Sequence, residues 1–564
     1  MLMRIMPPKE SADRDRRYAR AKWLTAAACL SALSLTSCGG GGGGASPAPN
    51  PPPPPPPPPS GVTWTPGVYA AASAFKDRCE IPRTGVDLNN RPFTDRQGTA
   101  LEERFWLRSW TNETYLWNTE VLDQNPANFN NRTDYFAVLK TTARTPSGKD
   151  KDDFHFSEST VDFQRRQISA PRATYGADLV ALATRPPRDY RVRFTEPNSP
   201  AAAVTNGQAN LVRGSRLLRV NGVDLVNGNT QADLDVLNAG LFPSAAGTTT
   251  TFVVRDPGAT ADRTVTLTSI SLSPSPVNRT RIIDTPTGKI GYILFNTFSP
   301  NASESAIVQA ITEMRINSVT DVVVDLRYNG GGLLAVASQL SYMLAGPTRT
   351  SNRAFERLRF NAAAGTRDPV TGQPNDPVPF YSRTLGFSLS SGQELPTLNL
   401  NRVFILSTER TCSASEAVIN GLRGIDFQVN LIGATTCGKP FGFYPQDNCG
   451  ETYYTIQFQG GNDKGFGDYA DGFITGNSPA AFGVRVPGCQ VADDLTRELG
   501  DANEALLAAA LSFRATGSCP AIPAGAAPSD LERPTSAGLA LEPPEPGVME
   551  LNRDMRLPPG MDRR

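Results

Sequence analysis

Apolar runs and helical patterns alternate along the second half of the chain, from Lys289 onward. Three short apolar runs have the length and the β-branched content of buried strands. These runs are IGYILF (290–295), DVVVDL (321–326) and RVFILS (402–407). Between the first two runs, Ile307, Ile311 and Met314 recur at helical spacing. The alternation predicts an α/β core with a mixed sheet.

The same pattern continues to the end of this region. A helix is expected over Leu333–Leu344, a second from Ser413 to about Leu422, and a closing helix over LGDANEALLAAALSF (499–513). LIGATT (431–436) is predicted to be a strand. The aromatic and glycine-rich stretch at 453–473 is predicted to form strands and a loop that wall a cleft.

Two further patterns precede this core. Apolar and aromatic residues between Leu101 and Lys140 predict helices, and their aromatic side chains are expected to form core. Residues 173–272 instead carry short alternating runs, among them FVVRD (252–256) and VTLTSI (265–270), which predict strands joined by turns.

The N-terminus has the composition of a targeting segment. Basic residues precede a weakly apolar run, Trp23 to Leu35, which is too short to span a membrane, and LTSC follows at 35–38. This arrangement resembles a bacterial lipoprotein signal, with cleavage before Cys38 and lipidation of its sulfur; ordinary cleavage at small residues is the alternative. Gly39 at the next position favours the outer membrane.

Both ends of the chain are predicted to lie outside a folded core. A glycine run (39–44) and a proline run (51–59) cannot bury apolar surface and predict a tether. The segment beyond Cys519 is rich in Pro, Ala and Glu and is expected to be disordered.

Composition narrows the function. The 564 residues, 39% of them hydrophobic, suffice for two or three domains. The 55 basic residues balance 55 acidic ones, which argues against a nucleic-acid partner. Cys29 would leave with the signal and Cys38 would take the lipid. Six cysteines remain, an even number that favours disulfides in an exported chain: Cys79, Cys412, Cys437, Cys449, Cys489 and Cys519. With no CxxC and one histidine, we expect neither a metal nor a cofactor.

Ser413 in TCSASE, Lys439 in TTCGKP and the glycines of DLRYNGGG (325–332) carry the candidate chemistry. A serine hydroxyl becomes a nucleophile when an adjacent base takes its proton, and a lysine can do so once burial lowers its pKa from about 10.4 towards neutrality. A glycine-rich turn lets backbone NH groups approach a developing oxyanion. The three elements together predict acyl transfer.

These strings, in this order, resemble the carboxyl-terminal processing proteases, serine endopeptidases with a Ser-Lys dyad and a PDZ domain. The 26-residue separation of Ser413 and Lys439 fits the family. The resemblance implies that Ser413 is the nucleophile, Lys439 the general base and Glu416 the carboxylate that orients it, with Asp426 a weaker candidate. NH groups of Ala414 and of Gly331 or Gly332 would form the oxyanion hole.

Departures from the family occur beside the dyad. GKP replaces the family's GKG, so Pro440 removes an NH after the lysine, and a cysteine stands one or two residues before each member of the dyad. Because the dyad must be in close contact, a Cys412–Cys437 disulfide is the pairing favoured by geometry, and Cys437–Cys449 is the alternative.

The family resemblance extends to the segment before the core. Residues 173–272 resemble a PDZ domain, and TYGADL stands where its carboxylate-binding loop should be, which makes Tyr175, Gly176, Ala177, Asp178 and Leu179 the candidate peptide-binding residues. Such a domain adds an extended peptide to a sheet edge and holds its terminal carboxylate. The helical segment before it matches the small N-terminal region of the family.

The expected fold is thus a multidomain α+β and α/β protein of a small N-terminal helical region, a PDZ domain and an α/β protease core with a mixed sheet of the ClpP/crotonase type. The predicted boundaries, in chain order, are signal 1–37, tether 38–75, helical region 76–168, PDZ domain 169–275, core 276–520 and disordered tail 521–564.

The expected function is that of an exported, lipid-anchored serine endopeptidase of the cell envelope that cleaves proteins or peptides near their C-termini or when unfolded. Two alternatives stay open. In one, His155 of the D-x-H string Asp153–His155 is the base, as in the tricorn protease core. In the other, the protein is an inactive periplasmic peptide-binding protein with a PDZ domain.

Overall fold

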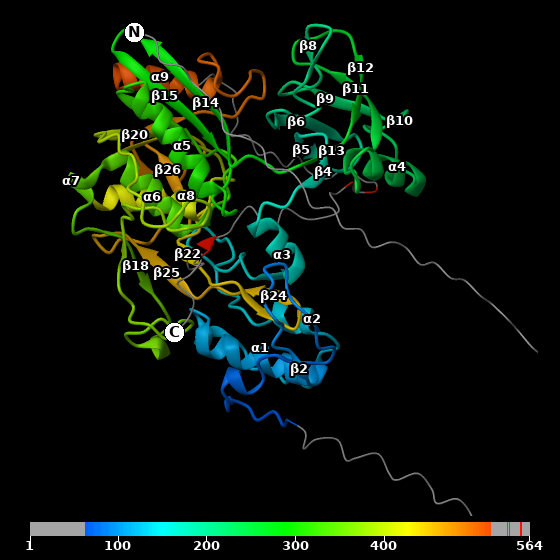
Figure 1. The fold of residues 1–564 in the computed structure, drawn as a ribbon, viewed down its shortest axis with the longest axis vertical. Coiled ribbons are helices and arrows are strands. Elements are labelled where there is room, and N and C mark those ends of the chain that lie inside the picture. The colour runs from blue at the N-terminus through cyan, green and yellow to red at the C-terminus, as the bar shows by residue number, and fades with distance from the viewer. Residues whose placement is uncertain (1–61, 521–538, 540, 542–552, 555–564) are drawn as a thin grey trace, which may run out of the picture. The chain divides into compact units, whose positions relative to one another are not determined.

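The predicted strands pair into one six-stranded mixed sheet (Figure 1). In the computed structural model, which describes residues 62–520, 539, 541 and 553–554, its order is β14-β15-β16-β20-β21-β28. The bounds are β14 (Val277–Thr285), β15 (Gly288–Phe295), β16 (Asp321–Asp325), β20 (Arg402–Ser407), β21 (Gln428–Gly433) and β28 (Gly488–Gln490). β14 is antiparallel to β15, and the other pairs are parallel. The predicted mixed α/β core is confirmed.

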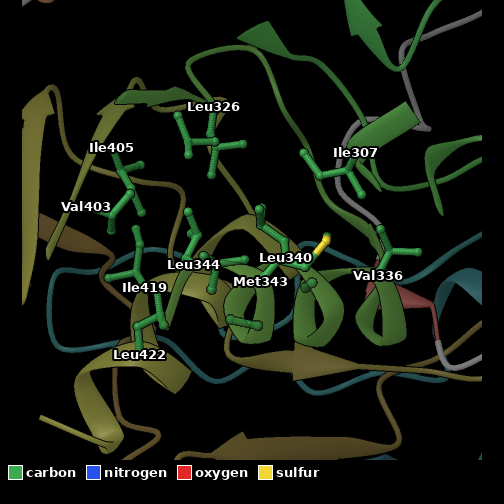
Figure 2. Packing of buried hydrophobic residues seen from close by; sticks show 14 of the residues in the cluster. Ile307, Leu326, Val336, Leu340, Met343, Leu344, Val403, Ile405, Ile419 and Leu422 are labelled. Carbon is green, nitrogen blue, oxygen red and sulfur yellow. The ribbon is translucent and has the colours of Figure 1, made fainter. Parts of the chain in front are cut away.

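Helices cover both faces of this sheet because successive strand side chains point to opposite sides. Val322 and Val324 join the cluster of apolar residues from α5, α6 and α8, whereas Val323 joins a cluster with α9. Figure 2 shows side chains of α6 and α8 packed against Val403 and Ile405 of β20. The helices are α5 (Ser303–Ile316), α6 (Leu334–Ala345), α7 (Pro347–Thr350), α8 (Ala414–Gly424) and α9 (Ala505–Thr516).

A second six-stranded sheet is built from residues between Ala177 and Thr268, and it has its own apolar cluster. Its order is β12-β11-β9-β6-β5, with β10 paired to β9. The helix α4 (Gln231–Leu241) begins at a capping box on Thr230 and contributes Leu234 and Leu237 to the cluster. The strands are β5 (Ala177–Ala183), β6 (Asp189–Thr195), β9 (Arg216–Val220), β10 (Val223–Asp224), β11 (Thr249–Arg255) and β12 (Arg263–Thr268).

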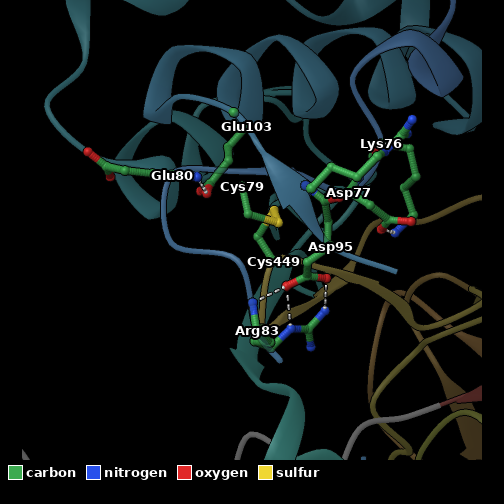
Figure 3. Close-up of a disulfide and its surroundings, with 12 residues drawn as sticks. Lys76, Asp77, Cys79, Glu80, Arg83, Asp95, Glu103 and Cys449 are labelled. Atoms are coloured by element: carbon green, nitrogen blue, oxygen red, sulfur yellow. Dashed lines mark hydrogen bonds and ion pairs between the residues drawn. A yellow bond between two sulfur atoms is a disulfide. The ribbon is translucent and has the colours of Figure 1, made fainter. Parts of the chain in front are cut away.

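The first described residues form a helical segment with α1 (Ala100–Thr114), α2 (Arg132–Ala137) and α3 (Thr160–Gln167). A disulfide between Cys79 and Cys449 joins this segment to a hairpin of the core (Figure 3). Arg83 bonds Asp95 at 2.8 Å beside the disulfide. The disulfide therefore fixes two segments that lie 370 residues apart in the chain.

The remaining strands are short. They are β1 (Arg78–Cys79), β2 (Arg96–Gln97), β3 (Phe156–Ser159), β4 (Arg172–Thr174), β7 (Val204–Thr205), β8 (Gln208–Ala209), β13 (Ile270–Leu272), β17 (Gly332–Leu333), β18 (Ala354–Arg359), β19 (Val378–Pro379), β22 (Phe441–Gly442), β23 (Gln446–Asn448), β24 (Glu451–Tyr454), β25 (Phe458–Gly461), β26 (Phe473–Thr475), β27 (Val484–Val486) and β29 (Arg553–Asp554).

The two ends of the chain fall mostly outside the described residues. The predicted signal, Cys38 and residues 38–61 of the predicted tether lie there. The tether prediction is wrong for residues 62–75, because Ala72 and Phe75 are buried in an apolar cluster with α1. Within the described part, no helix is both long and apolar enough to cross a membrane. The predicted disordered tail is wrong at Leu541, which is fully buried, and at β29, because both contact folded elements.

A buried ion network braces the chain just after β16. Arg327 is fully buried, and its guanidinium lies 2.6 Å from Glu504, 2.9 Å from Asp325 and 3.0 Å from Asp493. Burial of these carboxylates is tolerated because the arginine offers several donors in a fixed geometry. The network anchors the segment that leads into the triple glycine.

Glu504→Ala should lower the free energy of unfolding of the core by about 3–5 kcal/mol, because it removes one of the three carboxylates that pair with the buried guanidinium of Arg327. Glu394→Ala is the matched control, since Glu394 pairs with Arg383 at the surface, where such a pair contributes less than about 1 kcal/mol. Scanning calorimetry should show a clearly lower unfolding temperature for Glu504→Ala alone. Equal midpoints for the two variants would contradict the proposed bracing.

Candidate active site

Ser413 stands immediately before α8 in a backbone conformation that a serine rarely adopts. Its φ is +60° and its ψ is −111°. Such a conformation costs about 1–3 kcal/mol and persists only where the surrounding structure enforces it. The side chain is fully buried, and no residue in the described part of the chain hydrogen-bonds its hydroxyl. A strained turn into a helix is the arrangement that exposes a nucleophile to its substrate.

Lys439 lies in an aromatic pocket that suits a neutral amine. Its side chain is fully buried, with Nζ 4.6 Å from the ring centre of Phe154 and 4.4 Å from that of Phe443. Burial lowers the pKa of Lys439 to about 7, although the charges of Asp152 and Glu416 raise it. A substantial fraction of the Lys439 side chains is therefore neutral near pH 7 and able to accept a proton.

Glu416 connects the two predicted members of the dyad. This fully buried carboxylate accepts hydrogen bonds from the backbone NH of Ser413 at 2.9 Å, of Gly438 at 2.9 Å and of Lys439 at 2.8 Å. The hydroxyl of Thr436 donates a fourth bond at 2.5 Å. Burial raises the pKa of Glu416, while these donors lower it. Glu416 thus holds the backbone on both sides of the site.

The glycine loop lies directly beside the serine turn. The carbonyl of Asn329 accepts from Cys412 N at 3.1 Å and from Ser415 Oγ at 2.9 Å, so residues on both sides of Ser413 bond this loop. Gly332 has φ +131°, and a Cβ there would lie 2.2 Å from the backbone nitrogen of Ser299. No other residue fits at this position.

One predicted oxyanion donor is engaged elsewhere. The NH of Gly331 donates to the side-chain oxygen of Asn329 at 2.9 Å. Of the two alternative glycines, Gly331 is thus the less available donor in this conformation, because the side chain of Asn329 takes its NH. Gly332 and Ala414 remain the candidate donors. Ala414 opens α8, where helix NH groups and the helix dipole favour negative charge.

Three disulfides involve all six cysteines of the described residues. They are Cys79–Cys449, Cys412–Cys437 and Cys489–Cys519. The disulfide next to the dyad has its Cα atoms 5.2 Å apart, so the segments that carry Ser413 and Lys439 are covalently joined. The alternative pairing of Cys437 with Cys449 is wrong, because Cys449 bonds the N-terminal segment.

One family model matches the part of the chain that carries Ser413 and Lys439. Residues 289–444 match peptidase family S41. This part of the chain is similar to the carboxyl-terminal processing proteases, the name that two curated relatives carry. The resemblance noted from the sequence is confirmed, and the family consists of serine-type peptidases.

Two curated relatives carry the family name. A carboxyl-terminal-processing protease of Picosynechococcus is 24% identical over 250 residues, 43% of this chain and 49% of the relative. The chloroplastic carboxyl-terminal-processing peptidase 2 of Arabidopsis thaliana is 28% identical over 268 residues, 44% of this chain and 47% of the relative. The chain therefore spans about half the length of the curated relatives it matches.

A solved structure shares the fold. A candidate S41 protease from Bacteroides fragilis superposes with a TM-score of 0.55 at 24% identity and covers 73% of this chain and 97% of its own.

The N-terminal segment supplies residues that sequence reasoning missed. Asp152 is almost fully buried, accepts a hydrogen bond from Tyr115 Oη at 2.7 Å and acts electrostatically on Lys439. Phe154 forms a wall of the lysine pocket. Asp152 stands immediately before the D-x-H string that begins at Asp153, and the position next to that string is the only signal for it in the sequence.

His155 itself is held in a different role. Its Nε2 lies 2.9 Å from the carbonyl of Phe136 and its Nδ1 lies 3.2 Å from Thr455 Oγ1. Burial lowers its pKa to about 4. Both ring nitrogens thus have partners within the N-terminal segment and β24–β25 region, which argues against a role as base.

Three further features singled out in the sequence have structural partners of their own. Asp426 is exposed and pairs with Lys464, so it does not orient Lys439. The carbonyl of Pro440 accepts from Gly460 N at 2.9 Å, so the strand pairing after the lysine survives the loss of an NH. Of the predicted loop Tyr175–Leu179, only Tyr175 and Gly176 precede β5 of the second sheet; the other three residues belong to that strand, where Asp178 bonds Arg193.

If neutral Lys439 is the base, the rate at which a fluorophosphonate labels Ser413 should rise with pH through a midpoint near 7, because burial lowers the pKa of Lys439 to about 7. Asp152→Asn should move this midpoint to lower pH, since the carboxylate raises the pKa of Lys439. Asp153→Asn is the control, because Asp153 is exposed. A midpoint that Asp152→Asn leaves in place would show that this carboxylate does not tune the lysine.

A double variant Cys412→Ser, Cys437→Ser should stay folded, because Glu416 still ties the two segments together, but it should label at least several-fold more slowly. The reason is that the disulfide restrains the same turn that positions Ser413. Circular dichroism monitors the fold. Labelling at the wild-type rate would mean that the carboxylate alone is sufficient.

Proposed function

We propose that this protein is a serine endopeptidase with Ser413 as nucleophile and Lys439 as general base. The observation that carries the proposal is the strained turn at Ser413, with a buried hydroxyl that no described residue bonds and a backbone tied through Glu416 to Lys439. Structural serines at helix starts usually cap the helix with their hydroxyl. Here that hydroxyl is kept free of a cap bond.

Catalysis would proceed by two transfers of an acyl group. Neutral Lys439 takes the proton of Ser413 Oγ as that oxygen bonds the carbonyl carbon of the scissile peptide. The oxyanion forms beside the NH groups of Gly332 and Ala414 at the start of α8. The C–N bond then breaks, and the lysinium gives its proton to the leaving amine. Water repeats the sequence on the acyl-enzyme and releases Ser413.

Glu416 and the aromatic pocket would divide the work on the lysine. The pocket excludes water and keeps the amine neutral near pH 7. Glu416 contributes a negative charge that stabilises the lysinium when it forms, and it fixes the backbone from which the lysine extends. This arrangement supports Lys439 over His155 as the base.

Substrates would be proteins or peptides entering in extended form. We assign the second sheet with α4 to a PDZ-type module that captures peptide ends, on the basis of the segment Tyr175–Leu179, which enters the strand β5 at Ala177. Binding by strand addition recognises backbone and so tolerates many sequences. Cleavage near C-termini or of unfolded chains is the activity that such a module would favour.

Export and lipid anchoring complete the proposal. Three disulfides suit an oxidising compartment such as the periplasm. The signal-like N-terminus and Cys38 would then place the enzyme on the outer membrane through a lipid. Incorporation of labelled palmitate that is lost in Cys38→Ala would support this anchoring.

Ser413→Ala and Lys439→Met should each reduce cleavage of a denatured protein by at least about 10³-fold, because each removes a reacting group. Ser318→Ala and Lys464→Met are matched controls: Ser318 also has a positive φ but is exposed, and Lys464 lies at the surface. Both controls should keep full activity. Full activity in either dyad variant would exclude the dyad, and absence of labelling in folded wild type would favour an inactive binding protein.

A further inference from the structure

Two leucines of the C-terminal segment are bound on the second sheet. Leu541 is fully buried and belongs to the apolar cluster of that sheet. Its NH donates to the carbonyl of Thr184 at 3.0 Å, and Tyr190 Oη donates to its carbonyl. The NH of Leu539 donates to Asn229 Oδ1 at 2.7 Å. One backbone carbonyl and two side chains thus bond the backbone of the two leucines.

A buried arginine completes this docking site, which comprises Thr184, Arg188, Tyr190 and Asn229. Arg188 is fully buried, and one of its nitrogens donates to the carbonyl of Leu539 at 2.7 Å. Within the described part of the chain, its other hydrogen-bond acceptors are the carbonyls of Thr184, Leu225 and Gly228. A buried guanidinium needs acceptors for its donors, so the site is built to receive a carbonyl from an incoming chain.

The same C-terminal segment also reaches the glycine loop. The short strand β29 (Arg553–Asp554) pairs in parallel with β17 (Gly332–Leu333), so that Arg553 is opposite Gly332. β29 also lies against β22 (Phe441–Gly442), the strand that follows Lys439. An extended substrate held by backbone pairing would need this same edge of β17.

We propose that the C-terminal segment is an internal peptide ligand that occupies the docking site with Leu541 and the β17 edge with β29, and so excludes peptide substrates. This inference rests on the proposed peptidase function for its inhibitory part. A tethered ligand competes at an effective concentration that short linkers hold near the millimolar range. The tail would therefore lower the apparent affinity of every peptide that binds at the same place, and by the same factor.

The binding test uses the full-length chain with Ser413→Ala, so that no cleavage occurs. The probe is a fluorescent synthetic peptide of residues 537–556. Leu541→Asp should release the tail, because a carboxylate cannot enter the apolar cluster, and the peptide should then bind at least tenfold more tightly than to the chain with Leu541 intact. Leu539→Asp is the matched control, since Leu539 is 41% exposed and docks through its backbone. Equal affinity in all three proteins would overturn the inference.

The activity test repeats Leu541→Asp with Ser413 present. Cleavage of a denatured protein should show a several-fold lower KM with little change in kcat. Peptide 537–556 added in trans should restore inhibition, whereas peptide 537–545, which lacks the β29 residues, should bind but leave fluorophosphonate labelling of Ser413 unchanged. An unchanged KM would overturn the inhibitory role. Cleavage of the tail by the wild-type protein, absent in Ser413→Ala, would also overturn it, because the tail would then be a substrate.

The two tests separate the inference from the function on which it rests. If no variant cleaves or labels, the proposed peptidase fails, but tighter peptide binding to Leu541→Asp would still support the docking site. If wild type cleaves and Leu541→Asp changes neither binding nor KM, the peptidase stands and the internal ligand is excluded.

Discussion

The carboxylate of Glu416 is the contact on which the rest of the site depends. A serine with φ +60° returns to a relaxed turn unless something holds its backbone, and Glu416 does so by accepting its NH. The same carboxylate accepts the NH of Lys439, so one buried group sets the backbone positions of the proposed nucleophile and the proposed base together. Burying a charge is tolerated here because four donors converge on it, which also explains why Thr436 and Gly438 are packed so closely around it.

The lysine imposes the opposite requirement on its surroundings. A group that must be neutral near pH 7 needs a pocket without water, yet it must also accept a positive charge during each turnover. Aromatic faces meet both demands, because they exclude water and still attract a cation. Asp152 and Glu416 then limit how far burial lowers the pKa of Lys439. The N-terminal segment is therefore part of the chemistry, since it supplies both Asp152 and Phe154.

The sequence allowed prediction of whatever depends on local pattern. β16 and α8 were predictable from continuous apolar runs and helical spacing, and the Cys412–Cys437 pair from the closeness that the dyad demands. Asp152 was not predictable, because spacing does not reveal which distant segments meet. The tail shows a second limit: average composition predicts no core for residues 521–564, whereas docking needs only one leucine and a few backbone groups.

The glycine loop explains why β29 of the C-terminal segment pairs with β17. To serve an extended substrate, β17 must offer unpaired backbone groups at its edge, and such an edge attracts any available chain. Gly332 cannot carry a side chain that would block this edge, because a Cβ would collide with Ser299. Because β17 has unpaired backbone groups and Gly332 has no side chain, the edge is open to the chain's own tail. Pairing with β29 satisfies that edge from within the molecule, and the docking of Leu541 on the second sheet keeps the tail close enough to do so.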